Sequence, residues 1–405
     1  MQLFSPQELV AVPTSIYADA AAQPDQVLTA VALSHLCEPG DMLLGKLAQL
    51  LGQEWLLTAL IERWDTGKIS ATMGPDVEEL EGMFEQPLAK LWEAARERWL
   101  PRLNKSQVLE SVAWLAERKG KIYSWDCPGY PMGLNDLGYG KPPVLWLSGR
   151  AELLAEIPRI AVVGTRSSNR YGIQTTADIA AVAVQNQIVT VSGGAMGIDA
   201  VVHHSTLQLA GDTIAIMAGG LGNLYPRSNL EMLKRVGESG LLLAEQPPAV
   251  TPSKWRFLMR NRLIAALGDA TIIVQAGKTS GALNTGKHAL DLMRPVAVVP
   301  GPVDSAFSVG CHDFLNNNLG NVQLLARASG LPKLMGLEPD DLPAISGMGS
   351  LEKRALDTFS ELPNESWQVQ RLAGLTVSET QIALGALVLG GHLERVGSKF
   401  VRVSK

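Results

Sequence analysis

The chain has 405 residues, 46% of them hydrophobic, and a formal net charge of −5. This is enough apolar material for two or three globular domains, and it argues against a protein that coats nucleic acid with its whole surface. Cys37, Cys127 and Cys311 lie far apart without a CxxC pair, which argues against a disulfide framework or a zinc module, and the absence of a signal-peptide pattern or a long apolar run predicts a cytoplasmic protein without a membrane segment.

The N-terminal part is predicted to be a tail, residues 1–25, followed by a helical domain, residues 26–120. Apolar residues recur at helical spacing, as in LLGKLAQLLG and EWLLTALIERW, and no strand pattern interrupts them. Pro39-Gly40-Asp41 predicts a turn between two helices, as in a small SAM-like or helix-hairpin-helix bundle. Such a bundle either contacts the DNA backbone or serves only for packing.

Residues 121–325 are predicted to form an α/β domain with a Rossmann-like, doubly wound, mostly parallel sheet. Apolar runs alternate there with helical stretches, and their unbroken hydrophobicity is typical of strands buried on both faces. The runs are IAVVG (160–164), IVTVSGG (188–194), TIAIMAGG (213–220), LLLAE (241–245), ATIIVQA (270–276) and VAVVPG (296–301). In such a sheet a ligand binds beyond the carboxyl ends of the strands, where the strand order reverses.

The C-terminal part is predicted to be a linker, residues 326–349, and a winged-helix domain, residues 350–405. LEKRALDTFSEL, SWQVQRLAGL and SETQIALGALVLGG have helical patterns, and HLERVGSKFVRV predicts a hairpin that turns at Gly397-Ser398. Most winged helices bind DNA, but the second helix of this pair is poor in basic residues and carries Glu379. DNA and a protein partner therefore remain alternatives for this domain.

Basic residues concentrate in the centre of the chain. Residues 157–315 hold 13 Lys and Arg against 10 Asp and Glu, a balance of +3, which leaves −8 for the remainder. Between residues 251 and 294, seven Lys and Arg face only Asp269 and Asp291. An anionic ligand is expected at this segment.

Three strand-to-helix turns offer small residues to such an anion. They are Gly164-Thr165-Arg166, the SGGAMGID turn that begins with Ser192-Gly193-Gly194, and Lys278-Thr279-Ser280-Gly281. Backbone N–H groups and helix N-termini at such turns bind phosphate, although the glycines of the second turn suit close packing equally well. The GxGxxG spacing of nicotinamide and flavin enzymes is missing, and three turns on one rim favour a track of successive phosphates.

Two residues near the second turn have alternative roles. Asp199 is either a catalytic carboxylate or an acceptor that fixes the loop through backbone N–H groups, and the second interpretation is favoured. His203 has no cysteine or carboxylate at a metal-ligand spacing, so a packing role is predicted for it.

The stretch SKWRFLMRNR combines cations with aromatic rings. If its first part is extended, Lys254 and Arg256 lie on one face and Trp255 and Phe257 on the other. Phosphates and unstacked bases of a single strand require such a combination, although the rings also suit anchoring of the loop to the core. Arg260 shares the face of the apolar residues that follow, so it is predicted to point inward, where an arginine requires an anion.

The order and spacing of these motifs resemble the DprA/Smf family of DNA-processing proteins. The matching segments are GTR with a following YG, SGGAMGID with His203, TIAIMAGGL with YPRSN, RNRLIA, TSGALNT, and PGPVD with SVGC, and they cover about residues 126–325. The resemblance implies a homodimer that binds single-stranded DNA, protects incoming DNA and loads the RecA recombinase in natural transformation and recombination. It implies no cofactor, no metal and no catalytic turnover.

The resemblance also implies a set of DNA-facing residues. They are Gly164, Thr165, Arg166, Ser192, Gly193, Gly194, Arg227, Arg256, Phe257, Arg260, Asn261, Arg262, Lys278, Ser280 and Gly281. Two positions depart from the family pattern, because Met196 stands where many members have Arg or Lys and Gln275 replaces a usual Glu.

The alternative from another class is a LOG-type nucleotide phosphoribohydrolase, which has a similar fold and a PGGxGTxxE signature. The comparable turn here reads SGALNTGKHA and places Lys287 and His288 where the acid is needed. Without that carboxylate, cleavage of a glycosidic bond lacks its general acid or base.

Overall fold

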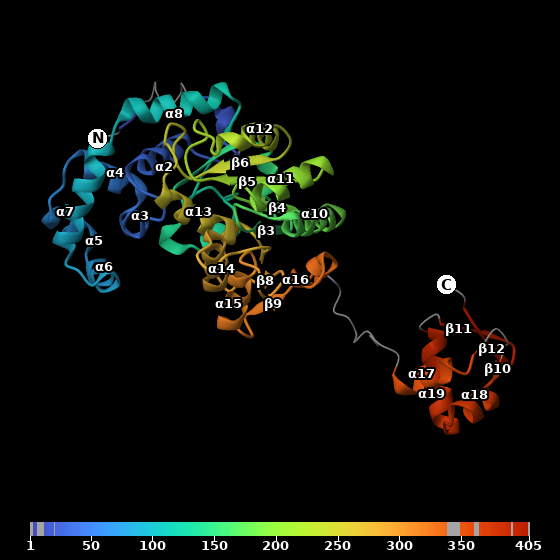
Figure 1. The fold of residues 1–405 in the computed structure, drawn as a ribbon. Helices are drawn as coiled ribbons and strands as arrows, with labels where there is room; N and C mark the ends of the chain where they lie inside the picture. Colours follow the sequence, from blue (N-terminus) through green and yellow to red (C-terminus); the bar gives the residue numbers. More distant parts are fainter. Residues whose placement is uncertain are drawn as a thin grey trace. The chain divides into compact units, whose positions relative to one another are not determined.

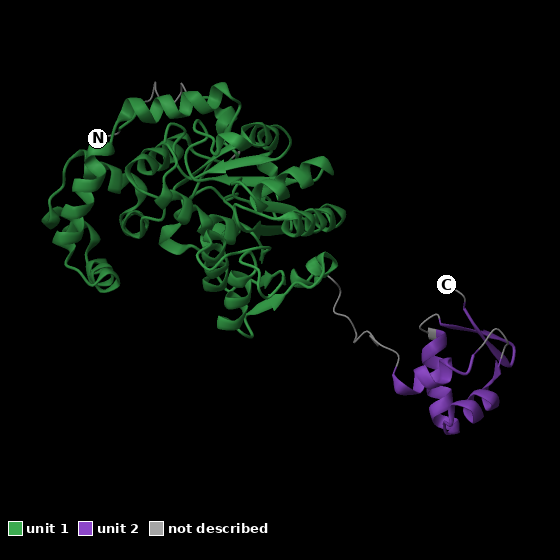
Figure 2. Cartoon of the chain, viewed as in Figure 1, with its two compact units in different colours: residues 1–337 green, residues 338–405 purple. Residues whose placement is uncertain are grey.

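The computed structural model describes residues 3–5, 12–19, 21–337, 349–359, 364–389 and 392–403. The chain forms two compact units, residues 1–337 and residues 338–405, which are green and purple in Figure 2. The first unit holds the N-terminal helices and a large sheet, and the second holds a smaller set of helices and strands.

The sheet of the first unit is mostly parallel (Figure 1). Its strands are β1 (Lys121–Ser124), β2 (Val144–Gly149), β3 (Arg159–Val163), β4 (Val189–Ser192), β5 (Thr213–Met217), β6 (Leu241–Ala244), β7 (Ala270–Ile273), β8 (Val296–Val298) and β9 (Val322–Leu324). They lie in the order β1-β2-β6-β5-β4-β3-β7-β8-β9. From β6 to β9 all pairs are parallel, whereas β1 and β2 add an antiparallel edge. The chain therefore winds outward from β3 in both directions, and the strand order reverses between β3 and β7.

All six apolar runs became strands of the parallel part, so the predicted mixed α/β fold with a mostly parallel sheet is confirmed. The sequence prediction did not include β1, β2 and β9. These are edge or near-edge strands, and β9 is buried only at Val322 while its other residues are exposed. β9 therefore lacks the continuous apolar run on which the prediction depended, whereas β2 does contain such a run, which the prediction did not assign to a strand.

Helices cover both faces of the sheet, as in a doubly wound fold. They are α9 (Met132–Asn135), α10 (Arg170–Gln185), α11 (Ile198–Gln208), α12 (Leu230–Ser239), α13 (Lys254–Leu267), α14 (Gly281–Asp291), α15 (Val309–Asn317) and α16 (Leu331–Leu334). Along β3, Ile160 and Val162 join the core under α10 and α11, whereas Ala161 and Val163 join the core shared with α13. The crossover from β6 to β7 thus passes to the opposite face, which opens a crevice at the point of reversal.

The segment that precedes the sheet is helical, as predicted. Its helices are α2 (Pro24–Leu36), α3 (Met42–Leu51), α4 (Gln53–Ile61), α5 (Thr66–Met73), α6 (Asp76–Phe84), α7 (Leu88–Trp99) and α8 (Lys105–Glu117). The turn at Pro39-Gly40-Asp41 separates α2 from α3, and the Asp41 carboxylate begins α3 by accepting the N–H groups of Leu43 and Leu44, both at 3.2 Å. Among the described residues no helix has the length and apolar character of a membrane span.

The N-terminal helices and the sheet share one hydrophobic core. α2 is buried nearly all round from Val27 to Leu36 and contacts both β1 and β2. One continuous core includes Leu33 of α2 and Trp146 of β2, both fully buried. The segments 26–120 and 121–325, which were expected as separate domains, consequently lie in one compact unit.

The first unit also extends into the predicted linker. A 3₁₀ turn, Ala328–Gly330, and the short helix α16 follow β9, and Leu331 and Leu334 enter the core beneath α10. The unit ends at Leu337, and much of the remaining predicted linker lies outside the described residues.

The second unit has three helices and a small antiparallel sheet in its described part. They are α17 (Ser350–Leu356), β10 (Asn364–Glu365), α18 (Ser366–Ala373), α19 (Val377–Leu389), β11 (Leu393–Val396) and β12 (Lys399–Arg402). The hairpin of β11 and β12 turns at Gly397-Ser398, as predicted. Glu379 closes a capping box at the start of α19, because its carboxylate accepts the Thr376 N–H at 2.8 Å and the Glu379 N–H donates to the Thr376 hydroxyl.

Candidate nucleic-acid interface

A crevice of about 730 Å³ opens at the carboxyl ends of β3 and β7, where the strand order reverses. In open α/β sheets this position is where ligands bind. The loop after β3, the loop after β7, the N-terminus of α14 and one face of α13 line it. Its residues are Val163, Gly164, Thr165, Arg166, Ala195, Asp199, Tyr225, Lys254, Phe257, Leu258, Arg260, Asn261, Ile264, Gly277, Thr279, Ser280, Gly281, Ala282 and Thr285.

The segment KWRF is helical, so the extended conformation considered for it is not the one that forms. α13 begins at Lys254, and the Ser253 hydroxyl caps it by accepting the Arg256 N–H at 3.3 Å. In a helix, residues three or four apart share a face. Lys254, Phe257 and Asn261 therefore line the crevice together, whereas Arg256 is turned elsewhere.

Arg166 and Phe257 form the outer wall of the crevice. The guanidinium carbon of Arg166 lies 5.1 Å from the centre of the Phe257 ring, and the ring of Tyr225 meets Phe257 edge-on at 5.7 Å. Arg166 and Lys254 are exposed, and neither side chain has a hydrogen bond or an ion pair with the residues that the structure describes. Two free cations beside two aromatic rings can bind phosphates and unstacked bases at once.

Arg260 lies beneath this wall and is buried, as the sequence predicted. Its Nη1 donates to the carbonyl of Gly193, at 2.7 Å, and to that of Ile216, at the ends of β4 and β5. The acceptors are thus backbone carbonyls of the protein itself. Burial lowers the pKa of Arg260 to about 10, with Asp199 opposing that shift, so the guanidinium remains charged near neutral pH.

Asp199 fixes the loop after β4. Its carboxylate accepts the Gly193 N–H at 3.2 Å, and the side chain is buried in the floor of the crevice. Burial raises the pKa of Asp199, while the charge of Arg260 and the backbone N–H groups of Ala195 and Gly193 act in the opposite direction. These contacts favour the loop-fixing interpretation of this residue.

The glycines of the second turn serve packing. Gly193 lies against the guanidinium of Arg260, and a methyl group at this position would overlap it. Gly194 has a φ of +65° and lies close to Leu233. The Ser192 hydroxyl donates to the Val162 carbonyl at 2.7 Å, so it is used within the sheet. None of these three predicted site residues lines the crevice.

The third turn forms the opposite wall. The Ser280 hydroxyl caps α14 by accepting the Ala282 N–H at 3.3 Å, and Gly281 is exposed to the crevice. Asn261 connects this wall to α13, because its Nδ2 donates to the Gly281 carbonyl at 3.2 Å. Lys278 lies outside the crevice and faces Asp313 at 3.8 Å, with both side chains exposed.

Two arginines of α13 face away from the crevice. Arg256 makes two hydrogen bonds to Glu38, Nε to Oε2 at 3.0 Å and Nη2 to Oε1 at 2.9 Å. They join α13 to the turn between α2 and α3. Arg262 forms a buried ion pair with Glu245. Burial raises the pKa of Glu245, and the neighbouring Arg262 acts against that shift.

Gln275, which follows β7, is bonded through both ends of its amide to Asn169, the N-cap residue of α10. Its Nε2 donates to Asn169 Oδ1 at 2.9 Å, and its Oε1 accepts the Asn169 N–H at 3.4 Å. A glutamate has no such donor in its ionised form. His203 is buried, with Nδ1 at 2.7 Å from the Thr213 hydroxyl, and burial lowers its pKa to about 3. Among the described residues no cluster of His, Cys, Asp and Glu is arranged to hold a metal ion.

Eight of the predicted site residues line the crevice: Gly164, Thr165, Arg166, Phe257, Arg260, Asn261, Ser280 and Gly281. The prediction omitted Lys254 and Tyr225 from this set. The sequence did contain a signal for Lys254, because Lys254, Phe257, Leu258 and Asn261 repeat at intervals of three and four after a serine N-cap.

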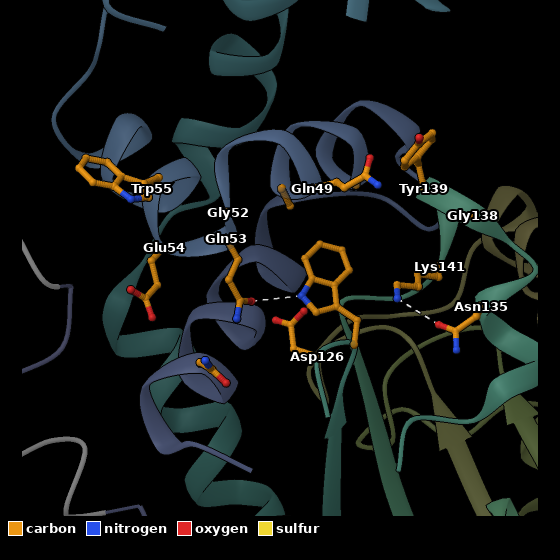
Figure 3. Close-up of a pocket in the computed structure, with 14 residues that line it drawn as sticks. Gln49, Gly52, Gln53, Glu54, Trp55, Asp126, Asn135, Gly138, Tyr139 and Lys141 are labelled. Atoms are coloured by element: carbon orange, nitrogen blue, oxygen red, sulfur yellow. Dashed lines mark hydrogen bonds between the residues drawn. The ribbon is translucent and has the colours of Figure 1, made fainter. Parts of the chain in front are cut away.

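A second hollow of about 670 Å³ lies between α3, α4 and the segment around β1 (Figure 3). Gln53, Asp126 and Lys141 line it, and Lys141 donates to Asn135 Oδ1 at 3.0 Å. Its charged lining residues are Glu54, Asp126 and Lys141, which gives no excess of positive charge. This hollow is therefore a poor site for phosphates, and it contains none of the predicted site residues.

Comparisons with known proteins identify the family. The sequence model of the family described as DNA recombination-mediator protein A matches residues 121–327. The chain belongs to this family. The matched region contains the whole sheet and every residue that lines the crevice. The resemblance to the DprA/Smf family that the motifs indicated is thereby confirmed.

Individual members agree with this assignment. The chain is 39% identical over 248 residues to a DprA-type protein of Mycobacterium tuberculosis (strain H37Rv), an alignment that covers 61% of this chain and 62% of that protein. It is 36% identical over 190 residues to the DNA processing protein DprA of Streptococcus pneumoniae, covering 47% of this chain and 66% of the relative. The chain thus spans less than two thirds of the length of these relatives.

A solved structure supports the fold. The X-ray structure of DNA processing protein A from Streptococcus pneumoniae is similar to this one with a TM-score of 0.57 and 26% sequence identity. The similarity covers 75% of this chain and 95% of that one.

Proposed function

We propose that this protein binds single-stranded DNA in the crevice between β3 and β7. The observation that carries the proposal is the outer wall of the crevice, where the free cations Arg166 and Lys254 lie beside the rings of Phe257 and Tyr225. Phosphates require the cations, and only unpaired bases expose the π-faces that such rings stack on. Membership of the DNA recombination-mediator protein A family supports DNA as the ligand.

The proposed contacts divide by chemistry. Arg166 and Lys254 bind backbone phosphates, and the backbone N–H groups at the start of α14, near Ser280 and Gly281, add a further phosphate site. Phe257 stacks on a base. Arg260 supports the site from below by holding the ends of β4 and β5 together.

A phosphoribohydrolase is a weaker candidate for this crevice. Among the described residues that line it, Asp199 is the only carboxylate, and it is occupied by the Gly193 N–H. A general acid or base has to reach the substrate, and this geometry favours binding without turnover.

Other properties are proposed from the family resemblance: a homodimer, a cytoplasmic location, protection of incoming DNA, and loading of RecA in transformation and recombination. The order α17, β10, α18, α19, β11, β12 supports a winged helix for the second unit. α19 contains no Lys or Arg and exposes Val377 and Ile382, so we assign this unit to a protein contact.

The test is a binding titration over a range of salt concentrations with labelled single-stranded and duplex oligonucleotides. Single strands are expected to bind more tightly, and Arg166→Gln is expected to make the slope of log affinity against log salt shallower by roughly 0.7. Phe257→Leu is expected to weaken binding by about 1 to 3 kcal/mol with little change of slope. Arg235→Gln is the matched control, an exposed arginine of α12 that lines neither hollow.

Equal affinity for duplex DNA would contradict the proposal. So would an Arg166→Gln protein that is folded but unchanged in both affinity and slope. Multiple-turnover release of a base from nucleoside monophosphates would favour the hydrolase instead.

A further inference from the structure

A groove of about 740 Å³ adjoins the crevice, and Tyr225 lines both. One side of the groove is the loop after β5, residues 221–225, together with Arg227. The other side is the end of α8, where Trp114 of the helix and Arg118, its C-cap residue, line the groove. Its lining residues include Arg118 and Arg227 and no Asp or Glu, so positive charge continues from the crevice into the groove.

In this groove the guanidinium of Arg118 lies over the indole ring of Trp114. The guanidinium carbon of Arg118 lies 4.3 Å from the centre of the indole ring, and Nη1 donates to the Trp114 carbonyl at 3.0 Å. Arg118 also pairs with Glu117 at 3.2 Å, but both side chains are at least half exposed, 50% and 72%. An exposed pair of this kind is worth only about 0 to 1 kcal/mol, so a phosphate or a base can displace the carboxylate.

The wall opposite α8 is hydrogen-bonded to a neighbouring segment of the chain. The Gly222 N–H donates to the Pro248 carbonyl at 3.0 Å, and Asn223 Nδ2 donates to the Ala249 carbonyl at 2.9 Å. A side chain at Gly222 would extend toward the Trp114 ring, which lies within van der Waals contact of that position. The loop is therefore fixed to residues 248–249, and it approaches the Trp114 ring at Gly222.

Arg227 lines the groove two residues after Tyr225, which lines both the groove and the crevice. It is exposed, and its side chain has no hydrogen bond or ion pair with the described part of the chain. Two residues further on, Asn229 Nδ2 donates to the carbonyls of Gly194 and Ala195, both at 3.0 Å. This turn is thus fixed to the loop after β4, and Ala195 of that loop lines the crevice.

We propose that the DNA strand bound in the crevice continues over Tyr225 into this groove, with a phosphate at Arg227 and a base stacked on the Arg118–Trp114 pair. Bases stack on guanidinium planes as well as on aromatic rings, and the Arg118 guanidinium, backed by the Trp114 indole, offers such a plane in the groove. The helical N-terminal part thereby becomes a contributor to DNA binding through α8. This inference rests on the proposed function of the crevice and adds a subsite to it.

The test uses the full chain and oligothymidylates of about 4 to about 20 nucleotides. Affinity of the wild type is expected to rise with length as the strand passes from the crevice into the groove. Arg118→Gln is expected to reduce affinity for the longest oligonucleotide by about five-fold or more, and to leave the shortest unaffected. The matched control is Arg98→Gln, because Arg98 is also an exposed arginine beside a tryptophan, 5.9 Å from the ring of Trp99. Arg98 lines neither the crevice nor the groove.

A crosslinking measurement does not depend on a variant. An oligothymidylate with one 5-iododeoxyuridine is irradiated on the wild-type protein, and the expected adduct is on Trp114. Unchanged length dependence in Arg118→Gln together with no adduct on α8 would overturn the inference. If the wild type binds no single strand at all, the proposed function fails; if Arg166→Gln weakens binding and Arg118→Gln does not, only the added subsite fails.

Discussion

Replacement of Arg260 by methionine tests whether this arginine is a structural support of the crevice. Arg260→Met keeps the length of the side chain and removes its charge and its donors. The change eliminates the hydrogen bonds to the carbonyls of Gly193 and Ile216 and leaves Asp199 buried without its neighbouring cation. Hydrogen bonds from a charged group contribute about 1.5 to 3 kcal/mol each.

The expected loss of unfolding free energy is therefore about 3 to 5 kcal/mol, the usual range when one partner of a buried charged network is removed. A loss of this size is a large fraction of the ~5 to 15 kcal/mol by which a typical protein is stable. The measurement is equilibrium unfolding in urea, followed by tryptophan fluorescence of the full chain. The control is Arg166→Met, which changes an exposed arginine on the same rim and is expected to shift stability by no more than about 0.5 kcal/mol.

A double-mutant cycle sharpens this test. When Asp199→Asn is combined with Arg260→Met, neither charge remains buried, and the double variant is expected to lose about 1 to 3 kcal/mol less than the sum of the single variants. A loss below about 1 kcal/mol in Arg260→Met, or strict additivity in the cycle, would refute the structural role. Arg260 would then be assigned, with Arg166, to the residues that are proposed to contact phosphate.

Three further predictions concern the rest of the first unit. Burial lowers the pKa of His203 to about 3 from an ordinary 6.5, so the unfolded chain takes up the proton first as the pH falls. The free energy of unfolding therefore decreases below pH 6.5, by about 2 kcal/mol at pH 5. A His203→Asn protein should show a correspondingly flatter pH dependence of unfolding between pH 6.5 and pH 5. Gly193→Ala should lower the stability of the protein by about 1 to 3 kcal/mol, because a methyl group there overlaps a buried guanidinium. Gly281→Ala, with open space around the added atom, should leave the stability unchanged, and thermal melts of both variants compare the two. Arg256→Gln should leave the salt dependence of DNA binding unchanged, since this arginine is hydrogen-bonded to Glu38. A shallower slope of log affinity against log salt would instead place Arg256 in the DNA interface.

Sequence alone was sufficient for the parallel sheet and for bringing residues of different turns to one crevice. Strands buried on both faces need unbroken apolar runs, and turns that bring backbone N–H groups to a ligand need small residues, so both features are visible along the chain. Gly164, Arg166 and Ser280, which belong to different turns, were predicted on one rim, and the structure places them in one crevice. The helical spacing of α13 was also present in the sequence, although an extended start of this segment was considered.

Only the tertiary structure decided which basic residues are free to bind a ligand. Arg256, Arg260 and Arg262 look alike in sequence, but each has found its acceptor elsewhere in the chain: Glu38, 218 residues away, the Gly193 carbonyl, 67 residues away, and Glu245, 17 residues away. Arg166 has no such acceptor among the described residues and remains exposed. The availability of a guanidinium depends on the carboxylates and carbonyls that folding brings within about 3 Å of it, and these contacts join distant segments that no local pattern relates.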